Sequence, residues 1–251
     1  MTEWEAIEQR ISCRAYRDER LPEDVVLQLK EKAAELSEAS GLRICICDGL
    51  DKPAVKLSGA MFSGKVYCCA ALIGKDEPLS AEKIGYYGQD LVLFATQLGL
   101  GTCWVAGTFD RKSIAVTLGA EERLWDVIPI GLPAEKTPRK QIMIRSAIRR
   151  RSRDLEDFVE AGQPFAELPA WVRKGAEAIR LGPSAVNQQP VNILWQDGIA
   201  RAKLWKHGHG LEYNDLGIAK KQFEVGAATC GVIGTWEFGD GGRFIVGNGV
   251  D

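Results

Sequence analysis

The sequence has little histidine and no long apolar run. His207 and His209 are its only histidines, and no two cysteines form a CxxC pair, so a zinc site is not expected. The chain also lacks a Gly-x-Ser-x-Gly elbow and a Walker sequence, and with so few histidines a Ser-His-Asp hydrolase is not expected. The longest apolar run, VYCCAALIG, has nine residues, against the roughly 20 needed to cross a bilayer.

A large excess of charge of either sign is also missing. The net charge is -2, with 45% hydrophobic and 26% charged residues, as in an ordinary globular protein without general attraction to nucleic acid. The first ten residues, MTEWEAIEQR, do not resemble a secretory signal. Several of the seven cysteines lie in apolar, strand-like runs. We therefore expect a cytoplasmic protein with neither membrane nor nucleic-acid partners.

Secondary-structure signals follow the same order in both halves of the chain. The first half predicts a helix over 21–40, strands over 42–49 and 66–74, and a helix over 87–98 that Gly99 ends. The second half predicts a helix over 169–180, a strand over 191–198 and a helix over 216–228. Residues 201–215 and the tail from Gly239 give no clear signal.

Short motifs repeat along with these elements. GLGTCW at 99–104 matches GVIGTW at 231–236, and 231 − 99 and 236 − 104 are both 132. CDG at 47–49 likewise corresponds to QDG at 196–198, each at the end of the strand after the first helix. Agreement in order, type and residues predicts a duplicated α+β unit with a pseudo-twofold axis. The predicted boundaries are a first lobe over 1–138, a basic connector over 139–153 and a second lobe over 154–251.

Arg10, Ser12 and Arg14 are the first candidate site. If this segment is extended, side chains two residues apart share a face, so both guanidinium groups and the hydroxyl point the same way. Arginine provides forked donors to anionic oxygens, and the arrangement suits a phosphate. The alternative is an ordinary solvated face with two arginines.

The loop in LGPSAVNQQPVNILW, residues 181–195, is the second candidate. It has more hydrogen-bonding side chains than a turn requires. Asn187 and Gln189 each carry a carbonyl and an NH2 group that could bind a heterocycle, Ser184 adds a hydroxyl, and Pro183 stiffens the loop. The alternative is a helix end followed by a turn, since Gly182-Pro183 would already end the helix.

Two further segments are weaker candidates. In the stretch 99–107, small residues such as Ala106 and Gly107 allow the backbone to approach a flat ligand, although tight packing is the simpler explanation. It is not a dinucleotide motif, because GxGxxG would need glycine where Trp104 stands. The segment 139–153 has seven Lys or Arg among fifteen residues, but no aromatic residues for stacking on bases. A solvated connector is expected there.

Taken together, these motifs resemble those of the nitroreductase family of flavin enzymes, and of its single-chain, internally duplicated branch. Arg10-x-Ser12-x-Arg14 resembles the N-terminal Arg-x-Ser-x-Arg of the family. GPSAVNQQPV is similar to its Ala-Pro-Ser-x-x-Asn-x-Gln-Pro-Trp loop, with Gly182 for Ala and Val191 for the aromatic residue. GLGTCWVAGTF and VIPIGLPAE resemble its glycine loop and final strand. The resemblance spans nearly the whole chain.

The resemblance implies a nitroreductase-like α+β fold in which two lobes of one chain form a pseudo-dimer around one FMN. Arg151-Ser-Arg153 and SEASGL would be the degenerate halves of a second site. Further pairing of chains stays open. The residues that would contact FMN are Arg10, Ser12 and Arg14 at the phosphate and ribityl chain, Trp104, Val105, Ala106 and Gly107 near flavin N5, Arg151 as a further phosphate contact, and Pro183, Ser184, Asn187 and Gln189 from the second lobe.

The activity implied is a ping-pong transfer of hydride from NADH or NADPH through flavin N5 to an oxidised acceptor such as a nitroaromatic or a quinone. The cofactor performs the chemistry and the protein positions it, so no catalytic side chain and no metal are predicted. Two alternatives stay open. One is a flavin- or nucleotide-binding module without turnover. The other is a nucleic-acid-binding or scaffold protein that uses the basic connector, whose binding would weaken with salt.

Overall fold

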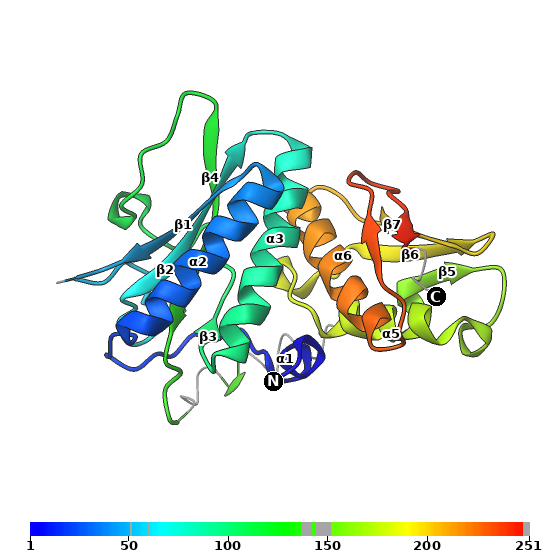
Figure 1. Cartoon of the computed structure of the whole chain (residues 1–251), viewed down its shortest axis with the longest axis horizontal. Helices are drawn as coiled ribbons and strands as arrows, with labels where there is room; N and C mark the ends of the chain where they lie inside the picture. Colours follow the sequence, from blue (N-terminus) through cyan, green and yellow to red (C-terminus); the bar gives the residue numbers. More distant parts are fainter. Residues whose placement is uncertain (51, 60, 137–141, 144–151, 248–251) are drawn as a thin grey trace.

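Two α+β lobes lie side by side in the computed structural model, with helices α3 and α6 adjacent between them (Figure 1). The structure describes residues 1–50, 52–59, 61–136, 142–143 and 152–247. The elements of the first lobe are α1 (Glu3–Gln9), α2 (Glu23–Ser40), β1 (Arg43–Asp48), β2 (Cys68–Lys75), α3 (Pro78–Gln97), β3 (Gly101–Thr102) and β4 (Glu122–Gly131). Those of the second are β5 (Val159–Ala161), α5 (Ala170–Leu181), β6 (Val191–Gln196), β7 (Ile199–Leu204), α6 (Glu212–Ala228), β8 (Gly234–Trp236) and β9 (Phe244–Val246).

The first lobe is an antiparallel sheet of order β1-β2-β4-β3 with both faces covered. Along β2, Cys68, Ala70 and Leu72 pack in one core cluster with residues of α2 and α3. The alternate residues Cys69 and Ala71 pack on the other face against loop residues. Because side chains alternate across a strand, the continuous apolar run of β2 is what a strand buried on both faces requires.

The second lobe packs α5 and α6 against a smaller set of strands. β6 pairs in parallel with β5 and antiparallel with β7, and the β8–β9 hairpin meets β7 at one bridge, Arg201 to Arg243. Four aromatic rings, with centroids 5.1 to 5.9 Å apart, lie among these elements, and the four are Trp171, Phe223, Trp236 and Phe244. Such edge-to-face and tilted contacts stabilise a core beyond the area they bury.

Gly85 in α3 and Gly217 in α6 bring the two helices into backbone contact. A Cβ added at Gly85 would lie 2.0 Å from the backbone oxygen of Asn214, and one at Gly217 would lie 1.9 Å from that of Glu82. The two contacts are related by one offset, since 217 − 85 and 214 − 82 are both 132. This is the offset of the repeated motifs, and the helix crossing therefore has the predicted pseudo-twofold symmetry.

A buried ion pair also joins the lobes. Lys220 of α6 and Glu82 of α3 are both fully buried and in contact. The Lys220 ammonium donates to the backbone oxygens of Glu237, at 2.8 Å, and of Gly239, at 2.9 Å, and the Gly239 N–H donates to Glu82 Oε2 at 2.6 Å. A buried pair that lacked such additional partners would cost more in desolvation than it returns.

The predicted α+β fold with two lobes is confirmed, while some helix boundaries differ. The predicted helix over 87–98 is α3, which begins earlier, with Pro78 in its first turn. Likewise α6 begins at Glu212, ahead of the predicted residue 216, because its acidic first turn complements the helix dipole. Gly99 and Gly231 follow α3 and α6 with φ of 76° and 77°, as the repeated motif requires.

The exact lobe boundaries stay a prediction. Most of the predicted connector, 139–153, lies outside the described residues. Within the part of the chain that the structure describes, no helix has the length and apolarity needed to span a bilayer.

Gly217→Ala tests the helix contact. Alanine in place of glycine inside a helix normally adds about 1 kcal/mol of stability. Here the added methyl group would meet the backbone of Glu82, and we expect a loss of at least about 2 kcal/mol in the free energy of unfolding, measured by urea denaturation. Gly162→Ala, where a Cβ meets nothing within 4 Å, is the control and should change stability little. Equal stability of Gly217→Ala and the wild type would contradict the close contact.

Candidate functional site

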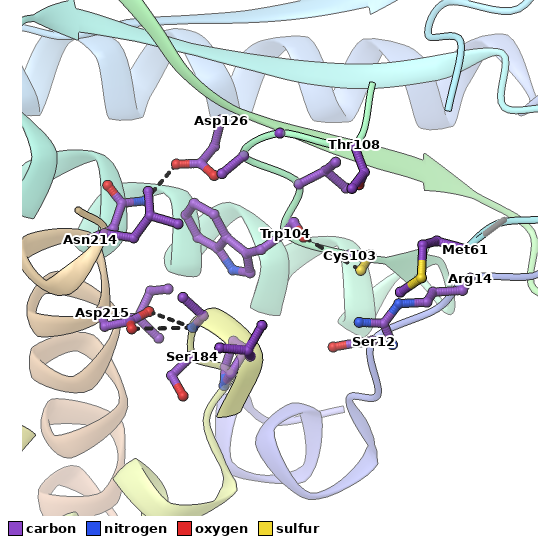
Figure 2. Close-up of a pocket in the computed structure, with 18 residues that line it drawn as sticks. Ser12, Arg14, Met61, Cys103, Trp104, Thr108, Asp126, Ser184, Asn214 and Asp215 are labelled. Carbon is purple, nitrogen blue, oxygen red and sulfur yellow. Dashed lines mark hydrogen bonds between the residues drawn. The ribbon is translucent and has the colours of Figure 1, made fainter. Parts of the chain in front are cut away.

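A cavity of about 480 Å³ lies between the lobes. Its volume is within the range of small-molecule and cofactor sites. Figure 2 shows Ser12 and Arg14 at one end, Asn214 and Asp215 at the other, and Trp104 between them. The lining residues come from both lobes and are Ser12, Arg14, Met61, Cys103, Trp104, Val105, Ala106, Gly107, Thr108, Asp126, Pro183, Ser184, Ala185, Val186, Leu211, Asn214, Asp215 and Ile218.

The cationic end is built by the extended N-terminal segment. Ser12 forms a parallel bridge with Thr102, and the N–H of Cys13 donates to the Thr102 oxygen at 2.8 Å. This pairing turns Cys13 into the core, where it is buried, and places Ser12 and Arg14 along the cavity. The predicted shared face is therefore present for Ser12 and Arg14.

Arg10 lies beside this end but does not line the cavity. Burial lowers the pKa of its guanidinium to about 10; the neighbouring Cys103 raises it and the charge of Arg14 lowers it. Its Nε is buried and has no hydrogen-bond partner among the described residues. Among the residues that the structure describes, neither Arg10 nor Arg14 forms an ion pair with a carboxylate. Two neighbouring cations without a counter-ion favour an anion at this end.

The middle of the cavity is formed by the loop after β3. Val105 and Val127 exchange two backbone hydrogen bonds, at 3.1 and 3.0 Å, which fixes the loop against β4. The Trp104 indole donates to Gln89 at 3.1 Å and packs so closely on Gly88 that a Cβ there would lie 2.5 Å from the ring. Trp104 is therefore a rigid wall of the cavity.

Ala106 and Gly107 expose backbone at the same wall. No hydrogen bond from the N–H of Ala106 or Gly107 is made within the described residues. A Cβ added at Gly107 would meet nothing within 4 Å. The backbone here is open to the cavity, and its donation to a flat ligand stays a prediction.

The loop from the second lobe brings Pro183 and Ser184 to the cavity, but not Asn187 or Gln189. Gln189 is buried: its NH2 donates to the Arg180 oxygen at 3.1 Å, and its carbonyl accepts from the Arg153 N–H at 3.0 Å. Asn187 donates to the Ser152 hydroxyl at 3.3 Å. These hydrogen bonds hold the loop itself, and the predicted contact of the two amides with a ligand stays a prediction.

This loop has an unusual backbone. Val186, Asn187 and Gln189 have φ of 45°, 57° and 47°, in the left-handed region that costs of order 1–3 kcal/mol for a β-branched residue such as valine. Two side-chain acceptors help to hold it: the Ser184 hydroxyl accepts from the Gln189 N–H at 2.9 Å, and the Asp215 carboxylate accepts from the Ala185 N–H at 3.0 and 3.2 Å.

Arg153 braces the loop from outside. Its guanidinium donates to the Gln189 oxygen at 3.0 Å and to Asn192 Oδ1 at 2.7 Å, and it lies 4.8 Å from the centre of the Trp205 ring. Arg151, predicted as a phosphate contact, lies outside the described residues.

The opposite end of the cavity carries two carboxyl groups that the sequence analysis missed. Asp126 in β4 accepts a hydrogen bond from the Asn214 amide at 2.6 Å, and Asp215 follows in α6. Burial raises the pKa of Asp126 to about 6, which the Asn214 hydrogen bond and two arginines partly offset. Burial raises the pKa of Asp215 to about 8; the Ala185 N–H lowers it and the charge of Asp126 raises it further.

A sequence signal for this end exists. Asp126 is the one charged residue in the otherwise apolar stretch LWDVIPIG, where a strand buried on both faces has no ordinary place for a carboxylate. Asn214 and Asp215 stand just before the predicted start of their helix, which is why the helical pattern did not include them.

Comparisons with known proteins identify the family and the fold of the chain. A family model described as "Putative TM nitroreductase" matches residues 3–227. The crystal structure of a protein described as a putative nitroreductase, from Thermotoga maritima, is 21% identical, with a TM-score of 0.63, and the match covers 98% of this chain and 93% of that one. At this identity the likeness shows the fold alone. No curated protein matches the chain.

Two smaller structures match with lower scores. A nitroreductase family protein of Clostridium novyi is 16% identical over 67% of this chain and 99% of its own, with a TM-score of 0.42. An FMN-dependent nitroreductase of Clostridium difficile is 18% identical over 53% of this chain and 88% of its own, also with a TM-score of 0.42. Likeness at this level is too slight to assign a cofactor or substrate.

The raised pKa of Asp215 predicts a pH-dependent stability. The folded protein keeps a proton on Asp215 up to a pH of about 8, whereas the unfolded chain releases it near pH 3.8. The stability that this proton provides is complete below about pH 4 and is lost as the pH rises through about 8. We expect Asp215→Asn, which can still accept from the Ala185 N–H, to gain stability relative to the wild type between pH 5 and 8.5 in urea unfolding. Asp154→Asn, at an exposed position, should run parallel to the wild type; a parallel Asp215→Asn curve would contradict the shift.

Proposed function

The chain belongs to the nitroreductase family described as "Putative TM nitroreductase", and on that premise we propose that it is an FMN-dependent oxidoreductase. It passes hydride from NADH or NADPH to an oxidised acceptor such as a quinone or a nitroaromatic. The observation that carries the proposal is the cavity between the lobes. It combines a cationic end, whose arginines pair with no carboxylate among the described residues, with an open backbone edge beside a fixed tryptophan.

The cationic end fits the phosphate of FMN. Arg14 and Ser12 line it, and Arg10 lies behind them with a buried Nε that has no partner in the described chain. An anionic oxygen would accept from the guanidinium groups and the hydroxyl, and its charge would offset the desolvation of Arg10. Arg151 stays a proposed further contact.

The middle of the cavity fits the flavin ring. Trp104 provides a flat wall, and the N–H groups of Ala106 and Gly107 would donate to the ring edge that carries N5. Pro183 and Ser184 would close the ring in from the second lobe. Bound FMN would supply the hydride chemistry, and these residues would bind it, orient it and exclude water from its edge.

The pseudo-symmetric counterpart of this site is already filled. The offset of 132 carries Gly107 to Gly239, whose N–H donates to Glu82. The same offset carries Ala106 to Phe238. The large ring of Phe238 lies 5.6 Å from the ring of Tyr86 and takes the place that the small Ala106 has in the first lobe. The Gly239 N–H that would meet a second flavin ring therefore already donates to the Glu82 carboxylate. This supports one FMN per chain.

A single cavity also suits a ping-pong sequence. The same wall of Trp104 and Gly107 would serve the nucleotide first and the acceptor afterwards, since both must approach the same edge. The apolar residues of the lining, including Met61, Val186 and Ile218, place no strict hydrogen-bond demand on the acceptor. This supports a broad choice of flat acceptors.

The visible spectrum of the purified protein tests the proposal. Near-stoichiometric flavin absorbance that bleaches without oxygen on addition of NADH or NADPH is expected. Flavin that does not bleach would instead identify a binding module without turnover. No binding at saturating FMN would overturn the assignment.

Arg14→Ala tests the placement of the phosphate. We expect the dissociation constant for FMN, measured by quenching of flavin fluorescence, to rise by the equivalent of about 1.5 to 3 kcal/mol, the contribution of a hydrogen bond to a charged group. Arg20→Ala removes an exposed arginine of the same segment that does not line the cavity, and is the matched control. An affinity that Arg14→Ala leaves at the wild-type value would show that the phosphate binds elsewhere.

A further inference from the structure

We propose that Asp126 is the proton donor to the electron acceptor, and that Asp215 and His209 connect it with the solvent that restores its proton. The inference deepens the proposed function and rests on it. It assigns a catalytic side chain to a site where neither the sequence nor the family comparison points to one.

The register of β4 places Asp126 beside the reacting edge. Val105 and Val127 face each other in an isolated antiparallel bridge, and Ala106 and Asp126 adjoin that bridge on the same side, because the two segments run in opposite directions. Both of these residues line the cavity. Asp126 therefore lies close to the backbone that is proposed to meet flavin N5.

The pseudo-symmetry gives independent support for this location. Asn214 is the counterpart of Glu82 at the offset of 132, and Glu82 reaches the N–H of Gly239, the counterpart of Gly107. Position 214 is thus on the side of the cavity from which a side chain approaches that amide. Asparagine is shorter; it instead donates to Asp126, and its Oδ1 is buried without a partner among the described residues.

Asp126 has one oxygen held and one available. Its Oδ2 accepts from Asn214. Its Oδ1 makes no hydrogen bond to any described residue and is not among the atoms sealed from solvent. Figure 2 shows the carboxyl group at the cavity wall near Trp104. The burial that raises its pKa to about 6 keeps a share of the group protonated near neutral pH, as a general acid requires.

The charged groups around Asp126 favour opposite protonation states. Arg111 and Arg123 lower its pKa from the first lobe, but less than burial raises it. On α6, the carboxyl group of Asp215 interacts electrostatically with Asp126, and Glu212 interacts in the same way with Asp215. Two neighbouring buried carboxyl groups resist becoming charged together, so at least one keeps its proton.

A route to the solvent leads through His209. Its Nε2 lies 3.7 Å from Asp215 Oδ2, and its Nδ1 lies 3.8 Å from a Glu212 oxygen. His209 Nε2 and Glu212 Oε2 are both buried without a hydrogen-bond partner in the described chain, although both side chains keep 14% of their surface exposed. Buried polar atoms without partners at such spacing point to intervening water or a proton path.

The proton balance of the step is simple. A quinone needs two electrons and two protons to become a hydroquinone. In the proposed function a hydride would come from the bound cofactor, and it would carry both electrons and one proton. The O–H bond of Asp126 breaks and an O–H bond of the product forms. The Asp126 carboxylate then regains a proton from Asp215, and Asp215 from solvent by way of His209.

Asp126→Asn in the holoenzyme tests the proposal by stopped flow. The flavin is first reduced chemically with dithionite, so that only the acceptor step is observed, and then mixed with 1,4-benzoquinone or with ferricyanide. We expect reoxidation by the quinone to slow by about 10²-fold, within the range of general acid catalysis. Reoxidation by ferricyanide, which takes electrons without a proton, should stay within about twofold. Glu121→Gln, at an exposed carboxyl near the start of β4, should leave both rates unchanged.

The wild type provides a second measurement should Asp126→Asn fail to fold. Its reoxidation by quinone should slow as the pH rises through about 6, whereas the ferricyanide rate should not. Infrared difference spectra of the protein without FMN, between pH 5 and 8, should show a protonated carboxyl that titrates in the same range, and Asp215→Asn, which removes the neighbouring carboxyl, should retain it. His209→Gln should slow successive turnovers more than the first one.

The outcomes separate this inference from the proposed function. If NADH and NADPH fail to reduce the wild-type flavin, the proposed function fails and this inference with it. Suppose instead that NADH or NADPH reduces the wild-type flavin. If Asp126→Asn then loses reactivity with both quinone and ferricyanide, or keeps both, Asp126 is not the proton donor. An unchanged dissociation constant for FMN in Asp126→Asn is expected, and a large rise would assign Asp126 to cofactor binding instead.

Discussion

The close crossing of α3 and α6 is the constraint on which the rest of the structure depends. Gly85 and Gly217 allow each helix to touch the backbone of the other, and the buried pair of Lys220 and Glu82 joins the same two helices. A closely packed interior has low compressibility, so it holds the elements on either side in a fixed relative position. Because the crossing fixes one lobe against the other, a cavity whose walls come from both lobes can have a defined shape.

The same symmetry explains why the two halves differ. Glu82 and Asn214 occupy equivalent positions in the two lobes. The difference between these two side chains determines whether the junction beside each of them is filled or open. On one side the Glu82 carboxylate accepts from the Gly239 N–H, and Lys220, which pairs with Glu82, fills the space beside it. On the other side the shorter asparagine leaves the Gly107 amide open and turns to Asp126 instead. The junction at Glu82 is therefore part of the core, whereas the junction at Asn214 contains the cavity.

The cavity keeps its cationic groups and its carboxyl groups at opposite ends. Among the described residues, Arg14 at one end forms no ion pair with a carboxylate, and Asp126 and Asp215 at the other form none with a lysine or an arginine. Direct pairing would be the cheaper arrangement for stability, because buried charges without partners are costly. Their separation indicates that ligands, rather than neighbouring side chains, complete the site. The strained loop at Val186, which Asp215 holds, has the same character of a feature kept for function.

The sequence by itself determined the α+β class, the duplication and one wall of the site. Those signals are local: the buried strand around Cys69, the αL glycines after two helices, and Ser12 and Arg14 on one face of an extended segment. Only the tertiary structure decided which loop side chains reach the cavity. Gln189 carries the hydrogen-bonding groups of a ligand contact, yet Arg153 and Arg180 satisfy them first. Asp126 stands out in the sequence as a lone charge in a buried strand, but its partner Asn214 is 88 residues away, and no local pattern encodes that contact.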